Sequence, residues 1–111
     1  MATVIGRPGW DELSGTPERD LLIGLDGADQ LDGLAENDTV LGGGGGDTAQ
    51  GGFGDDAVFG DAGGDLLFGD TCDGPLPAGY RPGEVPGSNF VLGGGGDDTI
   101  IAGFGVDTVL G

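Results

Sequence analysis

The sequence contains no histidine and no lysine, and its 3 basic residues are all arginines. Because phosphate contacts need Lys and Arg, a chain with a formal net charge of −17 is not expected to bind nucleic acid or an anionic membrane. Without histidine there is no Ser–His or Cys–His pair, and without lysine there is no P-loop. We therefore expect no enzymatic activity.

Cysteine and long apolar runs are equally scarce. The single cysteine, Cys72, cannot form an internal disulfide. No apolar run of about 20 residues could insert into a membrane, and the N-terminus lacks the basic start and apolar stretch of a Sec signal peptide. What the 111 residues do hold is 29 glycines and 20 acidic residues. Such a chain repels itself, and a metal ion is the simplest partner of opposite charge.

Aspartate recurs every nine residues through most of the chain. Its positions are Asp11, Asp20, Asp29, Asp38, Asp47, Asp56 and Asp65. When each repeat is numbered so that this Asp is sixth, the first residue is Gly and the eighth is Leu, Val or Ala. The same phase resumes with Asn89, Asp98 and Asp107 at the sixth position. A repeat that keeps several registers at a fixed period is typical of a solenoid.

The two halves of each repeat favour different structures. Positions seven to nine are mostly β-branched, aromatic or aliphatic and predict strands three residues long. Positions one to six are rich in Gly and Asp and predict a turn. In a strand of three residues the middle side chain points away from its neighbours, so position eight should fill the core. We expect an all-β solenoid of stacked short strands.

Three units carry a recognisable motif: GGGGGDTAQ at 42–50, GGFGDDAVF at 51–59 and GGGGDDTII at 93–101. They resemble GGxGxDxUx, the repeat of the RTX (hemolysin-type) calcium-binding family. The resemblance implies a right-handed parallel β-roll with two repeats per coil. It also implies calcium ions in the turns, between repeats n and n+2. We expect residues 1–111 to form one such roll, with 69–83 inserted as a surface loop within one turn.

Calcium accepts carbonyl oxygens beside carboxylates, whereas zinc and copper prefer the thiols and imidazoles that the repeats lack. Alternating repeats place the sixth-position residues on two edges of the roll. If the insertion only lengthens one turn, Asn89 lies on the second edge and Asp98 on the first. Adjacent pairs on an edge define up to about eight sites, of which we expect about five to seven to hold Ca²⁺. The predicted metal-site residues are Asp11, Asp20, Asp29, Asp38, Asp47, Asp56, Asp65, Asp98, Asp107, Asn89, Gly24, Gly27, Gly42, Gly44, Gly45, Gly51, Gly54, Gly60, Gly63, Gly93 and Gly96.

Two turns depart from the motif. Glu18 and Glu36 stand at position four, where the motif has Gly. Each glutamate either donates a carboxylate to an ion or distorts its turn, and the sequence leaves both alternatives open.

One outward face should be apolar. The predicted interface residues are Ile5, Leu21, Ile23, Leu41, Phe59, Phe90, Leu92 and Leu110. A monomer rarely exposes a contiguous apolar patch of this extent. Either the insertion or further chain covers it, or it is a surface for a partner or for self-association into a homo-oligomer or filament.

The insertion and Trp10 offer less specific signals. The proline-rich segment 70–88 is interpreted as an outgrowth of one turn, with a binding loop around Tyr80 and Arg81 as the alternative. Cys72 is interpreted as a bystander thiol, and Trp10 as a cap of the roll.

Calcium binding is expected to drive folding of this charged chain. The resemblance implies export without a Sec signal through a type I system, followed by folding outside the cell. We expect an extracellular or cell-surface calcium-binding structural module. The alternative is a segment of a larger secreted enzyme, toxin or adhesin.

Overall fold

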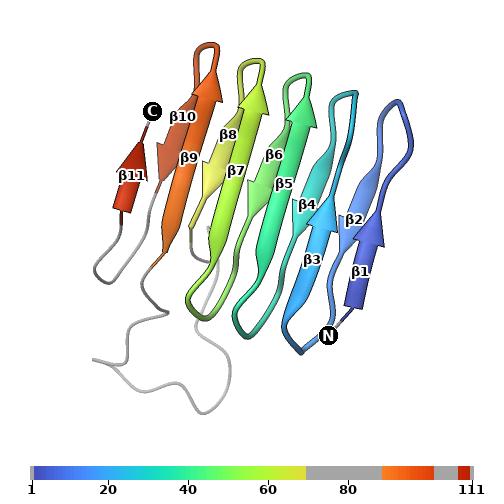
Figure 1. Cartoon of the computed structure of the whole chain (residues 1–111), viewed down its shortest axis with the longest axis vertical. Coiled ribbons are helices and arrows are strands. Elements are labelled where there is room, and N and C mark those ends of the chain that lie inside the picture. The colour runs from blue at the N-terminus through green and yellow to red at the C-terminus, as the bar shows by residue number, and fades with distance from the viewer. Residues whose placement is uncertain (1, 70–88, 102–107, 111) are drawn as a thin grey trace.

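The computed structural model describes residues 2–69, 89–101 and 108–110, and all regular structure in them is β-strand (Figure 1). The strands are β1 (Ala2–Ile5), β2 (Glu12–Ser14), β3 (Asp20–Ile23), β4 (Gln30–Asp32), β5 (Thr39–Gly44), β6 (Thr48–Gln50), β7 (Ala57–Ala62), β8 (Leu66–Phe68), β9 (Phe90–Gly95), β10 (Thr99–Ile101) and β11 (Thr108–Leu110). Most of the predicted 69–83 insertion, with Cys72, Tyr80 and Arg81, lies outside the described residues, as does Asp107.

The strands form two parallel sheets that face each other. Odd-numbered strands make one sheet in the order β1-β3-β5-β7-β9-β11, and even-numbered strands make the other in the order β10-β8-β6-β4-β2. The chain therefore crosses from one sheet to the other at every turn, and two repeats complete one coil (Figure 1). The predicted all-β parallel β-roll is confirmed.

The register is fixed by the repeat length. Val40 pairs with Val58, 18 residues later, which is two repeats of nine. Val58 pairs with Val91, 33 residues later, so the strand pairing stays in phase across the insertion. The predicted phase after the insertion is thereby confirmed.

The core is one row of side chains from each sheet. The buried members are the eighth residues of their repeats: Leu22, Leu31, Val40, Ala49, Val58, Leu67 and Val91. Val4, Leu13 and Ile100 are partly buried against them. The alternation of burial along each short strand places position eight inside, as predicted.

The strands of the larger sheet are longer than expected. β5, β7 and β9 each have six residues, where the pattern predicts three. Their last residues belong to the following turn and pair with the stacked turn, as Gly44 pairs with Ala62. Turns that repeat without insertions stack closely enough for their backbones to bond. Gly27 N–H, for example, donates to the carbonyl of Gly44 at 2.8 Å.

The two outward faces differ as predicted. On the larger sheet, position nine forms one continuous row: Ile5, Ile23, Leu41, Phe59, Leu92 and Leu110. At position seven Leu21, Ala57 and Phe90 lie in the adjoining row, and the rings of Phe59 and Phe90 are 5.9 Å apart. Ile5, Phe90 and Leu110 are exposed. The smaller sheet presents Ser14, Asp32 and Gln50 in the equivalent row, which ends in the apolar Phe68 and Ile101.

Candidate metal centre

The sixth-position residues form a hydrogen-bonded ladder along each edge of the roll. Within the described residues, all but Asp98 of these side chains are buried, although they are charged or polar. On one edge, Oδ1 of Asp29 accepts the backbone N–H of Asp11 at 2.8 Å. Asp47, Asp65 and Asp98 repeat this bond to the residue one coil earlier, at 2.8, 2.9 and 3.0 Å. Each Oδ1 is thus held by the backbone of the neighbouring coil.

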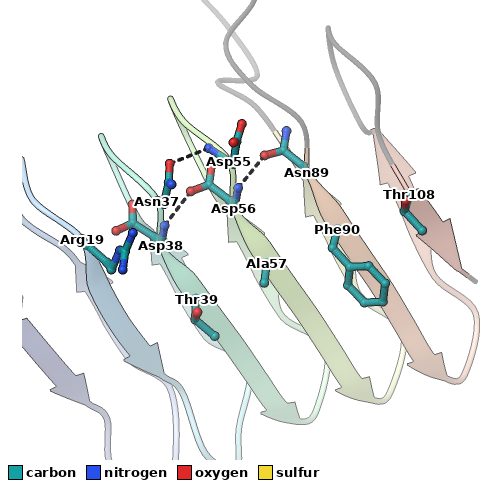
Figure 2. A pocket seen from close by; sticks show the side chains of 10 residues that line it. All are labelled: Arg19, Asn37, Asp38, Thr39, Asp55, Asp56, Ala57, Asn89, Phe90 and Thr108. Carbon is teal, nitrogen blue, oxygen red and sulfur yellow. Dashed lines mark hydrogen bonds between the residues drawn. The ribbon is translucent and has the colours of Figure 1, made fainter.

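The second edge repeats the arrangement (Figure 2). Oδ1 of Asp38 accepts the N–H of Asp20 at 2.7 Å, and Oδ1 of Asp56 accepts the N–H of Asp38 at 2.8 Å. Asn89 continues the row, because its Oδ1 accepts the N–H of Asp56 at 2.9 Å. The structure therefore places Asn89 on the second edge and Asp98 on the first, where the sequence predicted them.

The other carboxylate oxygen, Oδ2, differs from Oδ1 in its hydrogen bonding. Oδ2 is buried without a hydrogen-bond partner in Asp29, Asp38, Asp47, Asp56, Asp65 and Asp98. A buried charged oxygen without a partner is costly, and native structures rarely keep one without an ion or water. Burial raises the pKa of Asp38 and of Asp47 to about 6, and it also raises the pKa of Asp29 and Asp65. These oxygens are suited to accept a cation.

A second oxygen lies beside these carboxylates wherever the following coil is described. A Cβ added to Gly24 would come within 2.7 Å of Asp29 Oδ2 and within 2.5 Å of the carbonyl oxygen of Gly42 in the next coil. The other first-position glycines followed by a described coil face the same two oxygens: Gly6, Gly15, Gly33, Gly42, Gly51 and Gly60. Position one must be Gly because a side chain would fill the space between a carboxylate and a carbonyl.

In the described turns from 24–29 onward, the backbone is left-handed at positions two and four. The predicted glycines at position four, Gly27, Gly45, Gly54, Gly63 and Gly96, have φ between 103° and 116°. Glu36 also takes φ 71° at this position, so the turn at 33–38 keeps its shape. Glu18 does not, so among the described turns the one at 15–20 differs from the others at position four. Distortion thus applies to Glu18 but not to Glu36.

Side chains alone do not complete a coordination shell. Among the residues that the structure describes, no three acidic, cysteine or histidine side chains converge on one point. A cation here would be held by Asp Oδ2 together with backbone carbonyls such as that of Gly42. Mixed carboxylate and carbonyl ligation suits Ca²⁺, which takes six to eight oxygens, and does not suit metals that prefer nitrogen or sulfur.

Comparison with known proteins agrees with this chemistry. The family model described as RTX calcium-binding nonapeptide repeat (4 copies) matches residues 5–40, 41–71 and 85–111. The chain belongs to this RTX family. The RTX repeat binds calcium, and its recurrence along this chain implies calcium binding here. No curated protein matches the chain.

The RTX roll contains functional positions that sequence reasoning missed. The second residue of the turn is left-handed in Leu25, Leu34 and Asp61, although the motif gives no reason to expect this of non-glycine residues. The carbonyl oxygen of Gly44, which is predicted as a metal-site residue, accepts the turn-stacking bond from Gly27. In Asp11 and Asp20, also predicted as metal-site residues, Oδ2 accepts a backbone N–H from Arg7 and from Thr16. Among the described residues, none lies in a helix long and apolar enough to cross a membrane.

Proposed function

We propose that this RTX chain is an extracellular structural module that folds when its turns bind calcium. The observation that carries the proposal is the set of six buried Asp Oδ2 atoms without a partner. Each lies beside a backbone carbonyl of the next coil where such a coil is described, as Asp29 Oδ2 lies beside Gly42 O. The calcium ion would supply the positive charge that these oxygens lack.

The stacking of like charges explains why folding should depend on the ion. Burial raises the pKa of Asp47, and the negative charges of Asp29 and Asp65 raise it further. These two residues lie one coil away on either side of Asp47. The formal net charge of −17 adds repulsion across the whole chain. Since ligands are assembled only in the stacked turns, binding free energy becomes folding free energy. We propose about five to seven ions as the number needed.

Circular dichroism tests this proposal. In EGTA the far-UV spectrum should be that of a disordered chain, and millimolar Ca²⁺ should convert it to a β-sheet spectrum. Mg²⁺ is the control: it favours a tight octahedron and retains its waters, so the same concentration should leave the chain largely disordered. A β-sheet spectrum in EGTA would remove the basis of the proposal.

The extracellular location is supported by the same dependence. Sites assembled from several weak ligands suit the millimolar calcium of extracellular modules better than cytosolic levels. Disorder at low calcium would keep the chain unfolded before export. Calcium affinity measured by titration calorimetry tests this point. Dissociation constants well below micromolar would allow folding inside the cell and would contradict the proposed location.

A second proposed property is self-association through the larger sheet. The position-nine row from Ile5 to Leu110 and the Phe59–Phe90 pair form an outward apolar face, which a second copy of the chain would match by symmetry. Sedimentation in calcium should show a dimer or larger assembly. Phe90→Thr should reduce this association, because it removes an aromatic ring from the apolar face. Thr39 and Thr108 occupy the same row, so the strand should tolerate Thr at this position. The matched control is Phe68→Thr on the smaller sheet. A wild-type monomer at high concentration would contradict self-association.

A further inference from the structure

The first two turns of the roll, 6–11 and 15–20, treat their aspartates differently from the later turns. The N–H of Arg7 donates to Asp11 Oδ2 at 2.6 Å, and the N–H of Thr16 donates to Asp20 Oδ2 at 2.5 Å. The hydroxyl of Thr16 also lies 3.0 Å from both carboxylate oxygens of Asp20. In the six later turns that end at Asp29, Asp38, Asp47, Asp56, Asp65 and Asp98, Oδ2 has no partner.

The backbone at position two separates the same two groups. The second residue has positive φ in every one of those later turns: Leu25, Leu34, Gly43, Gly52, Asp61 and Gly94, with φ from 71° to 101°. Arg7 and Thr16 are absent from the residues with positive φ. With the ordinary backbone conformation, their N–H groups point at the carboxylate of their own turn.

The sequence explains this difference. Arg7 precedes Pro8 and Thr16 precedes Pro17, so both first turns have proline at position three. A residue before proline is restricted to extended or polyproline backbone by contact with the proline ring. The left-handed conformation of the later turns is therefore disfavoured at these two positions. Pro8 and Pro17 thus direct the N–H of the preceding residue to the Asp Oδ2 atom.

The turns 6–11 and 15–20 also contain positively charged side chains. Two of the 3 basic residues of the chain, Arg7 and Arg19, lie in them. Arg7 Nε is 3.9 Å from Asp11 Oδ1. Arg19 lines one pocket of about 440 Å³ together with Asp38 on the second edge (Figure 2). The hydrogen bond from the Thr16 backbone lowers the pKa of Asp20, whereas burial raises that of Asp38 in the next coil.

We infer that turns 6–11 and 15–20 are ion-free turns that cap the calcium ladder, with protein donors in place of the ion. This inference rests on the proposed calcium-binding function and identifies the turns that do not bind calcium. The first ions would then be bound at Asp29 and Asp38. Removing the two pairs that start at Asp11 and Asp20 leaves about six of the roughly eight adjacent pairs as binding sites.

Counting bound calcium tests the inference. Equilibrium dialysis against radioactive Ca²⁺ should give the same number of ions for Asp11→Asn and Asp20→Asn as for wild type. Asp29→Asn and Asp38→Asn make the same charge change in turns whose Asp Oδ2 has no partner. Each of these variants should bind at least one ion fewer. Equal losses in all four variants would overturn the inference while leaving calcium binding intact. A wild type that binds no calcium would instead overturn the proposed function.

A gain-of-site variant covers the case in which Asp11→Asn unfolds the first coil. Replacing both Arg7→Gly and Pro8→Gly gives the turn at 6–11 glycines at its first four positions, as at 42–45. The double variant should bind one ion more than wild type. In calcium-loaded wild type, the amides of Arg7 and Thr16 should exchange slowly with deuterium, and the Arg7 position should lose this protection in the variant. An unchanged ion count together with unchanged exchange would overturn the inference.

Discussion

Oδ1 of Asp47 accepts the backbone N–H of Asp29 at 2.8 Å, while Oδ2 of the same carboxylate is buried without a partner. One side chain therefore has two separate tasks. Oδ1 aligns neighbouring coils, and Oδ2 is the atom that we propose binds the cation. Asn89 shows that the first task survives without charge, since its Oδ1 accepts the N–H of Asp56.

This division predicts the effect of Asp47→Asn. The amide keeps an oxygen for the N–H of Asp29 but removes the negative charge that would hold calcium. We expect the variant to fold in excess calcium, to bind at least one ion fewer and to need a higher calcium concentration for half-folding. Calorimetric titration measures these quantities. Glu12→Gln is the charge-matched control, because Glu12 is exposed at the start of β2 and is not a sixth-position residue. Equal effects of the two substitutions would assign the result to net charge alone.

The buried carboxylates also predict a dependence on pH. The pKa of Asp38 and of Asp47 is raised from 3.8 to about 6 in the folded chain without ions. Folding then takes up protons, so the calcium-free roll should gain stability as the pH falls from 7 through about 6. The same protons compete with calcium, so calcium affinity should fall over this range. Circular dichroism of chelator-treated protein between pH 5 and 7 measures the first effect, and titration measures the second. Calcium-free folding that does not change with pH would contradict the predicted coupling.

Gly42 should tolerate no side chain. In Gly42→Ala the new Cβ would lie 2.6 Å from Asp47 Oδ2 and 2.9 Å from the carbonyl oxygen of Gly60. It would occupy the space between two expected ligands, so we predict the loss of one ion and a lower melting temperature in calcium. Gly95→Ala is the control, since a Cβ there meets nothing within 4 Å. Identical melting temperatures for the two variants would show that the space at Gly42 is not needed.

Glu36→Gly should stabilise the calcium-bound roll. Left-handed backbone costs a non-glycine residue about 1–2 kcal/mol, and ordering a glycine costs about 0.5–1 kcal/mol, so the net gain should be about 0.5–1 kcal/mol. Urea unfolding in saturating calcium measures it. Glu12→Gly in β2 should instead destabilise the roll. A drop in the number of bound ions in Glu36→Gly would mean that the Glu36 carboxylate is itself a ligand.

Much of the roll follows from the sequence because its period fixes several properties together. A step of nine residues determines which side chains share a sheet, so the sequence alone places Val40, Val58 and Val91 in one buried row. The two edges of aspartates and the apolar row from Ile5 to Leu110 follow from the same count. Asn89 could be assigned to its edge because the interrupted repeat resumes in phase.

Other features depend on backbone conformation, which the period does not determine. Leu25, Leu34 and Asp61 take positive φ because the stacked turns require one shape, whatever the side chain. The long strands β5, β7 and β9 arise from bonds between turns. The hydrogen bonds to Oδ2 of Asp11 and Asp20 were not predicted, although Pro8 and Pro17 in the sequence could have indicated them. Each of these turns ends in an Asp at position six, and the residues at positions two and three determine the hydrogen bonds of that Asp.

Anomalous diffraction from crystals grown in millimolar calcium tests the central claim most directly. The account predicts calcium peaks within about 2.3–2.6 Å of Oδ2 of Asp29, Asp38, Asp47, Asp56 and Asp65. It also predicts that Oδ2 of Asp11 and Asp20 keeps its protein donors and has no peak beside it. Calcium-loaded crystals of the folded roll without peaks at the five Oδ2 atoms would contradict the claim that these carboxylates hold the ions.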